Sequence, residues 1–360
     1  MSRVLVMAGG TGGHIYPALA VAKNLTAKGW QVEWLGTPRG LENQLVPQAG
    51  FPLNHISVSG VRGKGVAGLL AAPWKILKSC LQARKLLKQL KPDLVIGFGG
   101  FASGPGGLMA SVMNIPLVIH EQNAIAGTTN KILAGRASRV LQAFPNALKN
   151  GVVTGNPVRD EIVELSDLVV AEAIDSSVQK KLKLLIVGGS LGALALNKAM
   201  PAVASGLADK VEVWHQTGAR TLEIAQQGYA EQSLVIEPKV TAYIDDMASA
   251  YAWADLVVCR AGALTVSEVA AAGLPAIFIP FPQAIDDHQT ANAGYLVDKD
   301  AAVLLAQSDL TSERLQKLIE SYLTPEGRKQ LAQMASNAKK AAIVDATEVV
   351  VKHCLEVTGG

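Results

Sequence analysis

The sequence has little charge and little sulfur for its length. Asp, Glu, Lys and Arg make up 18% of its 360 residues, whereas hydrophobic residues make up 49%. A charge fraction this low predicts that part of the surface is covered by something other than water, and a membrane is one candidate. The three cysteines, at positions 80, 259 and 354, share no metal-ligand spacing and form no even disulfide framework, which favours a reducing compartment such as the cytosol.

Long apolar runs are also missing. No stretch reaches the roughly 20 apolar residues that a transmembrane helix needs. The first apolar run begins directly after Arg3 and is too short for the core of a signal peptide followed by a cleavage site, so we expect no secretory leader.

Two segments of the chain begin in the same way. Residues 3–13 read RVLVMAGGTGG and residues 183–192 read KLLIVGGSLG, each an apolar strand that runs into a glycine-rich turn with a hydroxyl residue. A strand, a glycine-rich turn and a helix form the phosphate-binding start of a βαβ unit. A second copy roughly 180 residues later predicts two such domains with a cleft between them.

Short apolar runs alternate with helical patterns through both halves of the chain. Most are apolar on both faces, as expected for parallel strands covered by helices. The expected strands are VLVMA, QVEWLG, LVIGFG, PLVIHE and RVLQAF in the first half and KLLIVGG, VEVWHQTG, LVIEPK, LVVCRAG and PAIFIPFP in the second. The pattern predicts an α/β fold with two Rossmann-like, doubly wound domains.

A Gly-Asn-Pro turn at 155–157 predicts the boundary between the domains. We expect an N-terminal domain over residues 1–158 and a C-terminal domain over 159–340. The tail at 341–360 has helical periodicity and is expected to pack back on the first domain.

The glycine turns do not match the common nucleotide fingerprints. A G-x-G-x-x-G pattern starting at Gly10 would need glycine where Ile15 stands, which disfavours NAD. No G-x-x-x-x-G-K-[ST] sequence occurs, which excludes a P-loop. Residues 188–192 match the hydrolase elbow G-x-S-x-G, but the adjacent Asp286, Asp287 and His288 cannot easily complete a triad. A phosphate cradle at a helix N-terminus is the favoured interpretation.

Polar residues gather where strands of the first domain end. His14 closes the first glycine turn, where it could act as a base or merely hydrogen-bond the loop. The sequence His-Glu-Gln-Asn at 120–123 follows an apolar strand, at the edge where open sheets bind ligands. The glycine-rich run at 97–107 could let a polar group approach the backbone closely, or could be only a flexible turn.

The second domain carries the strongest signal, at residues 259–268. A strand end and a small-residue turn lead into a helix that opens with hydroxyls and a carboxylate. Amides and hydroxyls at such an N-terminus suit a diphosphate, and Glu268 could accept bonds from both ribose hydroxyls. The alternative is an ordinary first-turn acid in a capped helix.

Residues 43–92 contain no acidic residue, and their basic residues alternate with aliphatics and one tryptophan. Such a stretch favours contact with an anionic membrane surface, although a solvated basic helix face would look similar. Few aromatics make a nucleic-acid patch less favoured. The residues expected at the membrane are Val61, Leu69, Leu70, Trp74, Lys75, Leu77 and Lys78.

Six motifs in order give the chain a resemblance to a known family. They are GGTGGH at 9–14, GFGGFASGP at 97–105, HEQN at 120–123, TGNPVR at 154–159, GGSLGA at 188–193 and ALTVSE at 263–268. The sequence resembles, nearly end to end, the MurG family of bacterial UDP-N-acetylglucosamine:lipid I N-acetylglucosaminyltransferases.

The resemblance implies a GT-B fold and inverting transfer without a metal ion or cofactor. The implied substrates are UDP-N-acetylglucosamine, bound by the second domain, and lipid I, an undecaprenyl-pyrophosphoryl-MurNAc-pentapeptide met by the first. The product would be lipid II, made by a peripheral protein on the cytoplasmic side of the inner membrane. Cell-wall synthesis and division proteins are the implied protein partners, and no nucleic acid is implied.

The resemblance also implies roles for single residues. His14 would be the general base, with Glu121 as the alternative, and the mechanism would stabilise a leaving diphosphate. The implied donor-binding residues are Thr11, Gly12, Gly13, Asn123, Arg159, Ser190, Ile244, Ala263, Leu264, Thr265, Val266, Ser267, Glu268 and Gln289. Family members often have two adjacent glutamines in the last of these loops, whereas here His288 precedes Gln289.

Two alternatives stay open from the sequence. A UDP-N-acetylglucosamine 2-epimerase shares the two-domain architecture, but it needs no lipid-facing surface like the one around Trp74. A catalytically silent membrane-bound sensor of nucleotide sugar would keep donor binding through Glu268 and never transfer sugar.

Overall fold

The computed structural model describes residues 2–58, 65–165, 180–189 and 192–359, except for the side chains of 65–72 and 285. The chain divides into two compact units. Unit 1 comprises Met1–Arg159 and Ile343–Gly360, and unit 2 comprises Asp160–Ala342. The chain passes from unit 1 to unit 2 after Arg159, one residue beyond the boundary expected at 158. It returns to unit 1 after Ala342, two residues beyond the boundary expected at 340.

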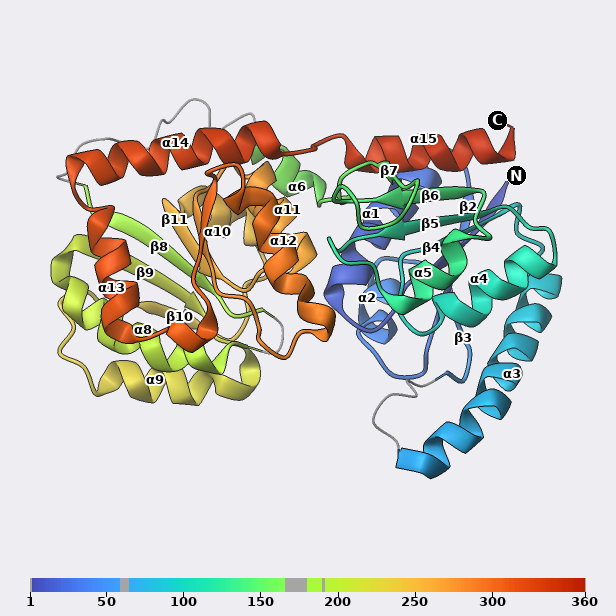
Figure 1. Cartoon of the computed structure of the whole chain (residues 1–360), viewed down its shortest axis with the longest axis horizontal. Coiled ribbons are helices and arrows are strands. Elements are labelled where there is room, and N and C mark those ends of the chain that lie inside the picture. Colours follow the sequence, from blue (N-terminus) through green and yellow to red (C-terminus); the bar gives the residue numbers. More distant parts are fainter. Residues whose placement is uncertain (1, 59–64, 166–179, 190–191, 360) are drawn as a thin grey trace. The chain divides into compact units, whose positions relative to one another are not determined.

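Unit 1 is built on a parallel sheet with helices on both faces (Figure 1). Over the described residues the sheet has seven strands in the order β3-β2-β1-β4-β5-β6-β7. Its strands are β1 (Arg3–Met7), β2 (Gln31–Gly36), β3 (Leu53–His55), β4 (Leu94–Gly97), β5 (Leu117–Glu121), β6 (Arg139–Gln142) and β7 (Val152–Val153). Its helices are α1 (Gly12–Ala27), α2 (Glu42–Gln48), α3 (Gly65–Leu90), α4 (Ser103–Val112), α5 (Thr128–Ala134) and α15 (Ala346–Thr358).

Side chains of β1 alternate between two apolar layers. Val4 and Val6 join the layer that contains α1 and α15, whereas Leu5 and Met7 join the layer beneath α3 and α4. The C-terminal helix α15 lies against α1 and contributes the buried Cys354 to the first layer (Figure 1). The tail of the chain is therefore part of the core of unit 1.

Unit 2 repeats this design with a second parallel sheet. Over the described residues its parallel sheet has six strands in the order β10-β9-β8-β11-β12-β13. The strands are β8 (Leu182–Val187), β9 (Val211–Gln216), β10 (Lys239–Thr241), β11 (Leu256–Cys259), β12 (Ala276–Phe278) and β13 (Ala302–Leu304). The helices are α6 (Asp160–Val163), α8 (Leu194–Leu207), α9 (Leu222–Ala230), α10 (Met247–Trp253), α11 (Ala263–Ala271), α12 (His288–Val297), α13 (Ser312–Ser321) and α14 (Pro325–Ala341).

One expected strand is wrong and three short ones were missed. Residues 234–238 of the LVIEPK run form no strand, Val235 is 68% exposed, and β10 begins only at Lys239. The missed strands β3, β7 and β13 contain two or three residues each, too few to show a pattern in the sequence.

All three thiols are buried in these cores. Cys80 lies in α3, Cys259 ends β11, and Cys354 lies in α15. Burial raises the pKa of each thiol, so the thiolate form is disfavoured at neutral pH. The cysteines are structural apolar residues.

Each unit also buries a histidine. His215 of β9 is fully buried, with Nδ1 3.0 Å from the Tyr229 hydroxyl and Nε2 3.1 Å from Asn197 Oδ1. Burial lowers the pKa of His215 to about 3 and that of His120, in unit 1, to about 4. Both rings are therefore neutral in the folded protein at a pH where the unfolded chain is protonated.

We expect the protein to lose stability as the pH falls from 7 to 5. Because the folded pKa values of His215 and His120 lie below the ordinary 6.5, unfolding takes up protons once the pH drops below that value. Each histidine then lowers the free energy of unfolding by about 1.4 kcal/mol per pH unit. Melting curves over this range test the slope, which should be shallower in His215→Gln. An equal slope in that variant would contradict the assignment.

Candidate functional site

Three loops meet at the carboxyl edge of the unit 1 sheet. Strands β1, β4 and β5 are neighbours, and because they are parallel their following loops lie on one edge. These loops carry GGTGGH, GFGGFASGP and HEQN. Motifs far apart in the sequence are thus brought together.

The first two loops pack backbone against backbone. Gly100 has a φ of +82°, and a Cβ at this position would lie 2.6 Å from the carbonyl oxygen of Gly9. Ser103 Oγ fastens the second loop by donating to the carbonyls of Gly99, at 2.6 Å, and Met7, at 3.1 Å. The approach requires glycine at position 100.

A buried carboxylate holds the first glycine turn from the other side. Glu42, at the start of α2, is fully buried and accepts from the Gly10 amide at 2.9 Å. Its other oxygen accepts from the amide and hydroxyl of Thr37, at 3.1 and 2.8 Å. Nothing in the sequence pattern indicated this residue, because it belongs to no motif.

His14 lies in the first turn of α1, half-buried, with Nδ1 2.7 Å from Gln122 Oε1. Thr11 is the N-cap, its backbone is extended, and within the described chain no side chain caps this helix. The amides of Gly12 and Gly13, in the first turn, therefore lack intrahelical partners. They present positive partial charge beside the imidazole.

Glu121 is engaged by the loop that follows it. This buried carboxylate accepts from the Asn123 amide at 2.9 Å, the Asn123 side chain at 3.2 Å, the Gly127 amide at 3.0 Å and Asn130 Nδ2 at 2.9 Å. Both oxygens thus hold the loop after β5. This geometry favours Glu121 as the anchor of Asn123 over a role in proton transfer.

Arg159 stands at the end of unit 1, with its guanidinium carbon 5.3 Å from the centre of the Tyr16 ring. Tyr16 lies in α1, two residues after His14. The cation–π contact places the charge of Arg159 beside the helix whose first turn carries the glycine motif.

In unit 2 the loop after β8 is equally tight. Gly192 has a φ of +77°, and a Cβ there would lie 2.3 Å from the Thr217 carbonyl oxygen. Gln216 braces the loop, accepting from the Gly189 amide at 3.0 Å and donating to the Gly189 carbonyl at 3.1 Å. Ser190, an expected donor contact, lies outside the described residues.

The helix after β11 opens toward the same edge. Gly262 is the N-cap of α11, and across the described residues no side chain caps this helix, so the amides of 263–265 lack intrahelical partners. Glu268 is buried and accepts from the Tyr251 hydroxyl at 3.2 Å. A carboxylate accepts hydrogen bonds, and the hydroxyl groups of a ligand are donors of the kind it takes.

The other residues of α11 divide between site and core. Thr265 and Ser267 are half-buried, and Ser267 Oγ donates to the Ala263 carbonyl at 3.1 Å. Ala263, Leu264 and Val266 are buried, so these three offer a ligand only backbone atoms.

Two further expected contacts lie in loops after other strands of unit 2. Ile244, buried, follows β10. Gln289, at the start of α12, accepts from the Phe281 amide at 2.9 Å and so braces the loop after β12. The side-chain oxygen of Gln289 therefore has a partner within unit 2.

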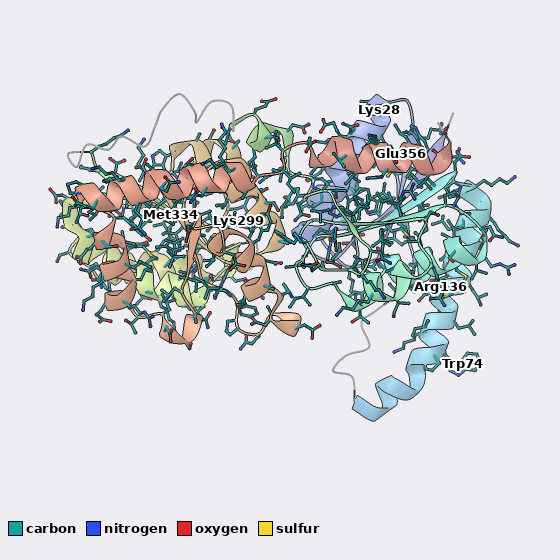
Figure 2. All side chains as sticks on the ribbon, turned by 45° about the horizontal axis from the view of Figure 1, so that its top comes forward. Lys28, Trp74, Arg136, Lys299, Met334 and Glu356 are labelled. Atoms are coloured by element: carbon teal, nitrogen blue, oxygen red, sulfur yellow. The ribbon has the colours of Figure 1, made fainter. Side chains whose placement is uncertain are left out.

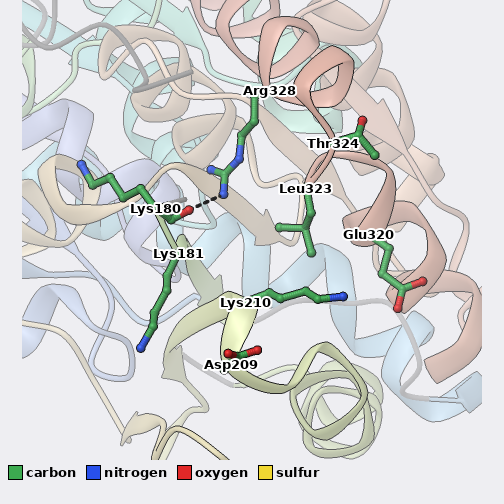
Figure 3. Close-up of a pocket in the computed structure, with 8 residues that line it drawn as sticks. All are labelled: Lys180, Lys181, Asp209, Lys210, Glu320, Leu323, Thr324 and Arg328. Carbon is green, nitrogen blue, oxygen red and sulfur yellow. Dashed lines mark hydrogen bonds between the residues drawn. The ribbon is translucent and has the colours of Figure 1, made fainter. Parts of the chain in front are cut away.

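A cavity of about 750 Å³ lies at the opposite edge of this sheet (Figure 3). Lys180 and Lys181 precede β8 and Lys210 precedes β9, so the cavity opens at the amino ends of the strands.

Asp298 and Asp300 are separated by one residue, and they precede β13, so they lie toward the amino end of that strand. Over the described residues, no group of three or more His, Cys, Asp or Glu is placed to hold a metal ion.

Comparison with known proteins accounts for both units. A family model described as the glycosyltransferase family 28 N-terminal domain matches residues 4–142, and the corresponding C-terminal domain matches residues 183–350. A UDP-N-acetylglucosamine--N-acetylmuramyl-(pentapeptide) pyrophosphoryl-undecaprenol N-acetylglucosamine transferase of Aeromonas hydrophila is 52% identical, covering 99% of this chain and 97% of its own. A Shewanella amazonensis protein of the same name is 51% identical, with 99% and 98% covered.

The crystal structure of Acinetobacter baumannii MurG matches with a TM-score of 0.84 at 43% identity, over 99% of this chain and 100% of that one. The chain belongs to the MurG family. The two Rossmann-like units are those of the GT-B fold, as expected. A UDP-GlcNAc 2-epimerase from Neisseria meningitidis, at 12% identity and a TM-score of 0.67, shares only the fold, and the epimerase alternative is not supported.

The MurG-family motifs therefore occupy two carboxyl edges, one in each unit. Sequence reasoning found the strand-end motifs but missed the side chains that hold them, chiefly Glu42, Gln216 and Tyr251. These side chains belong to neighbouring helices and strands, so no local sequence pattern predicts their contacts with the motifs.

Glu42→Ala should destabilise unit 1, because it leaves the amide of Gly10 and the buried amide of Thr37 without the carboxylate that accepts from them. The expected loss is about 2–4 kcal/mol in the free energy of unfolding. Glu42→Gln, which keeps one acceptor oxygen, should cost less. Chemical denaturation measures both, with the exposed Glu348→Ala of α15 as the control that changes stability little. A Glu42→Ala protein as stable as the control would contradict the bracing role.

Proposed function

We propose that the chain transfers N-acetylglucosamine from UDP-N-acetylglucosamine to the 4-hydroxyl of the MurNAc residue of lipid I, with inversion, to give lipid II. Similarity to transferases named for this reaction, 51% identical over 99% of the chain, is the observation that carries the proposal. Such a product feeds wall growth, so cell-wall synthesis and division proteins are the partners we expect.

Unit 2 supplies the donor site in this proposal. The uncapped first turn of α11 offers amides to the diphosphate, and the buried Glu268 accepts from the ribose hydroxyls. Ile244 would meet uracil through its backbone, and Gln289 the sugar. Thr11, Gly12, Gly13 and Asn123 would contact the donor from unit 1, and Arg159 a phosphate.

In the transfer, the oxygen of the acceptor 4-hydroxyl forms a bond to the anomeric carbon as the bond from that carbon to the β-phosphate oxygen breaks. The hydroxyl proton passes to His14, and UDP leaves with the bonding electron pair. Helix amides and Arg159 stabilise the negative charge that develops on the diphosphate. His14 is the base because its ring ends the first glycine motif, half-buried at the strand-end edge.

Transfer of labelled N-acetylglucosamine from UDP to a lipid I analogue tests the proposal. We expect transfer to persist in EDTA. His14→Ala should lower kcat by about 10²- to 10⁴-fold with nearly unchanged donor affinity, because it removes the base. Glu268→Ala should weaken UDP binding about 10- to 100-fold, because it removes a charged acceptor from the ribose.

A large loss of donor affinity in His14→Ala would show that His14 binds donor and is not the base. Wild-type protein that binds UDP without ever forming a lipid-linked product would favour the silent sensor. Formation of an epimerised sugar nucleotide without transfer would favour the epimerase alternative.

The amino-terminal half of α3 is the membrane contact in this proposal. Residues 73–78 are all exposed, and six consecutive residues span more than one helical turn, so this part of the helix is exposed around its whole circumference. Figure 2 shows Trp74 on this part of α3. Trp74 is 75% exposed and lies beside Lys75, Leu77 and Lys78. Farther along α3 the side chains of Cys80, Ala83 and Leu87 are buried, so this part of the helix packs against the rest of unit 1.

Exposed apolar side chains flanked by lysines suit an anionic bilayer surface on the cytoplasmic side of the inner membrane. Across the described residues, none of the helices is long and apolar enough to cross a membrane. Val61 lies outside the described residues, and Leu69 and Leu70 lie in a part of α3 without described side chains. The proposed contact therefore rests on residues 73–78.

Sedimentation with anionic phospholipid vesicles tests this contact. Trp74→Ser with Leu77→Ser should weaken binding about tenfold or more, because two apolar side chains no longer enter the bilayer. Lys75→Gln with Lys78→Gln should weaken it too, at about 1 kcal/mol per charge, and only on anionic vesicles. Val235→Ser, at an exposed apolar residue of unit 2, is the control. Unchanged binding in both α3 variants would place the contact elsewhere.

A further inference from the structure

A chain of buried side chains ends at His14. Its Nδ1 lies 2.7 Å from Oε1 of Gln122, the residue that directly follows strand β5. Gln122 is 1% exposed, so its amide group finds its partners inside the protein. These partners fix which of its atoms faces the imidazole.

The orientation of the Gln122 amide follows from the backbone. The side-chain nitrogen lies 2.8 Å from the carbonyl oxygen of His120, and a carbonyl oxygen can only accept. The atom facing this carbonyl is therefore the NH₂ group. The oxygen of Gln122 must then face His14, and it needs a proton from His14 Nδ1.

The second proton of the Gln122 amide has a partner as well. Gln122 Nε2 lies 3.0 Å from Nδ1 of His120, whose Nε2 lies 2.9 Å from the Gly155 carbonyl oxygen. His120 must donate through Nε2, so its Nδ1 is free to accept from the glutamine. Because burial lowers the pKa of His120 to about 4, the ring keeps this neutral form at physiological pH.

The hydrogen bonds of this series therefore all run in one direction: His14 donates to Gln122, Gln122 donates to His120, and His120 donates to the Gly155 carbonyl. The glycine loop confines the ring further, since a Cβ at Gly99 would lie 3.2 Å from His14 Cε1 and 3.3 Å from Nδ1. Reversing the tautomer of His14 would set the lone pair of Nδ1 against the lone pairs of Gln122 Oε1.

We propose that Gln122 is a positioning residue that holds neutral His14 with its proton on Nδ1 and its lone pair on Nε2. Nε2 is the nitrogen that would take the acceptor proton. The role of His14 as base rests on the proposed function, whereas the tautomer itself does not.

Nitrogen NMR of protein labelled with ¹⁵N-histidine reads the tautomer directly. At pH 8, where an ordinary imidazole is neutral, His14 should show a protonated Nδ1 and an unprotonated Nε2. The His14→Gln variant assigns the signal among the six histidines. A protonated Nε2 in the wild-type protein would overturn the proposal without any variant.

Gln122→Met removes the acceptor while keeping an unbranched side chain. We expect His14 to shift toward the Nε2-protonated form and kcat to fall about 10- to 100-fold with donor KM nearly unchanged, a part of what a general base supplies. The matched control is Gln142→Met. Gln142 is also a buried glutamine that braces a loop of unit 1, donating to the Gly151 carbonyl at 2.8 Å and accepting from the Leu148 amide at 2.7 Å.

The control should leave both tautomer and kcat unchanged. An unaltered tautomer in Gln122→Met, or the same change in Gln142→Met, would overturn the positioning role. A shifted tautomer with an unchanged kcat would leave the positioning role standing and remove His14 as the base.

Discussion

The parallel pairing of β1 with β4 and of β4 with β5 is the constraint on which the unit 1 site depends. Parallel strands end at one edge, so their loops converge whatever their separation in the sequence. Because the loops converge, their backbones come into close contact at Gly100 and Gly9. Glycine in these motifs is thus a consequence of strand order as well as of ligand binding.

Buried polar side chains turn this crowding into fixed geometry. In unit 1, Glu42 accepts from backbone amides of two neighbouring loops, and Glu121 accepts from backbone amides of the loop that follows it. In unit 2, Gln216 spans the loop after β8 with a donor and an acceptor. A loop held in this way can present amides to a ligand without ordering itself on binding, which preserves binding free energy.

The sequence was sufficient for the strands that form the centre of each sheet, because β1, β4, β8 and β11 each contain an uninterrupted apolar run of three or four residues that leads into a glycine-containing or polar turn. It failed where a strand depends on its neighbour: β10 pairs with β9 only from Lys239, after an apolar run in which Val235 is 68% exposed. The motifs located His14 and Glu268. The bond from His14 to Gln122 could not be foreseen, since it depends on how close two loops approach and on which way an amide points.

The burial of every thiol has a practical consequence. Cys80, Cys259 and Cys354 are enclosed in apolar cores, and their raised pKa values keep them protonated. Thiol reagents act on the thiolate, so the native protein presents them with poor targets. A single cysteine introduced at an exposed position of α3 would be the preferred attachment point for a fluorescent or spin label, with no native cysteine needing removal first.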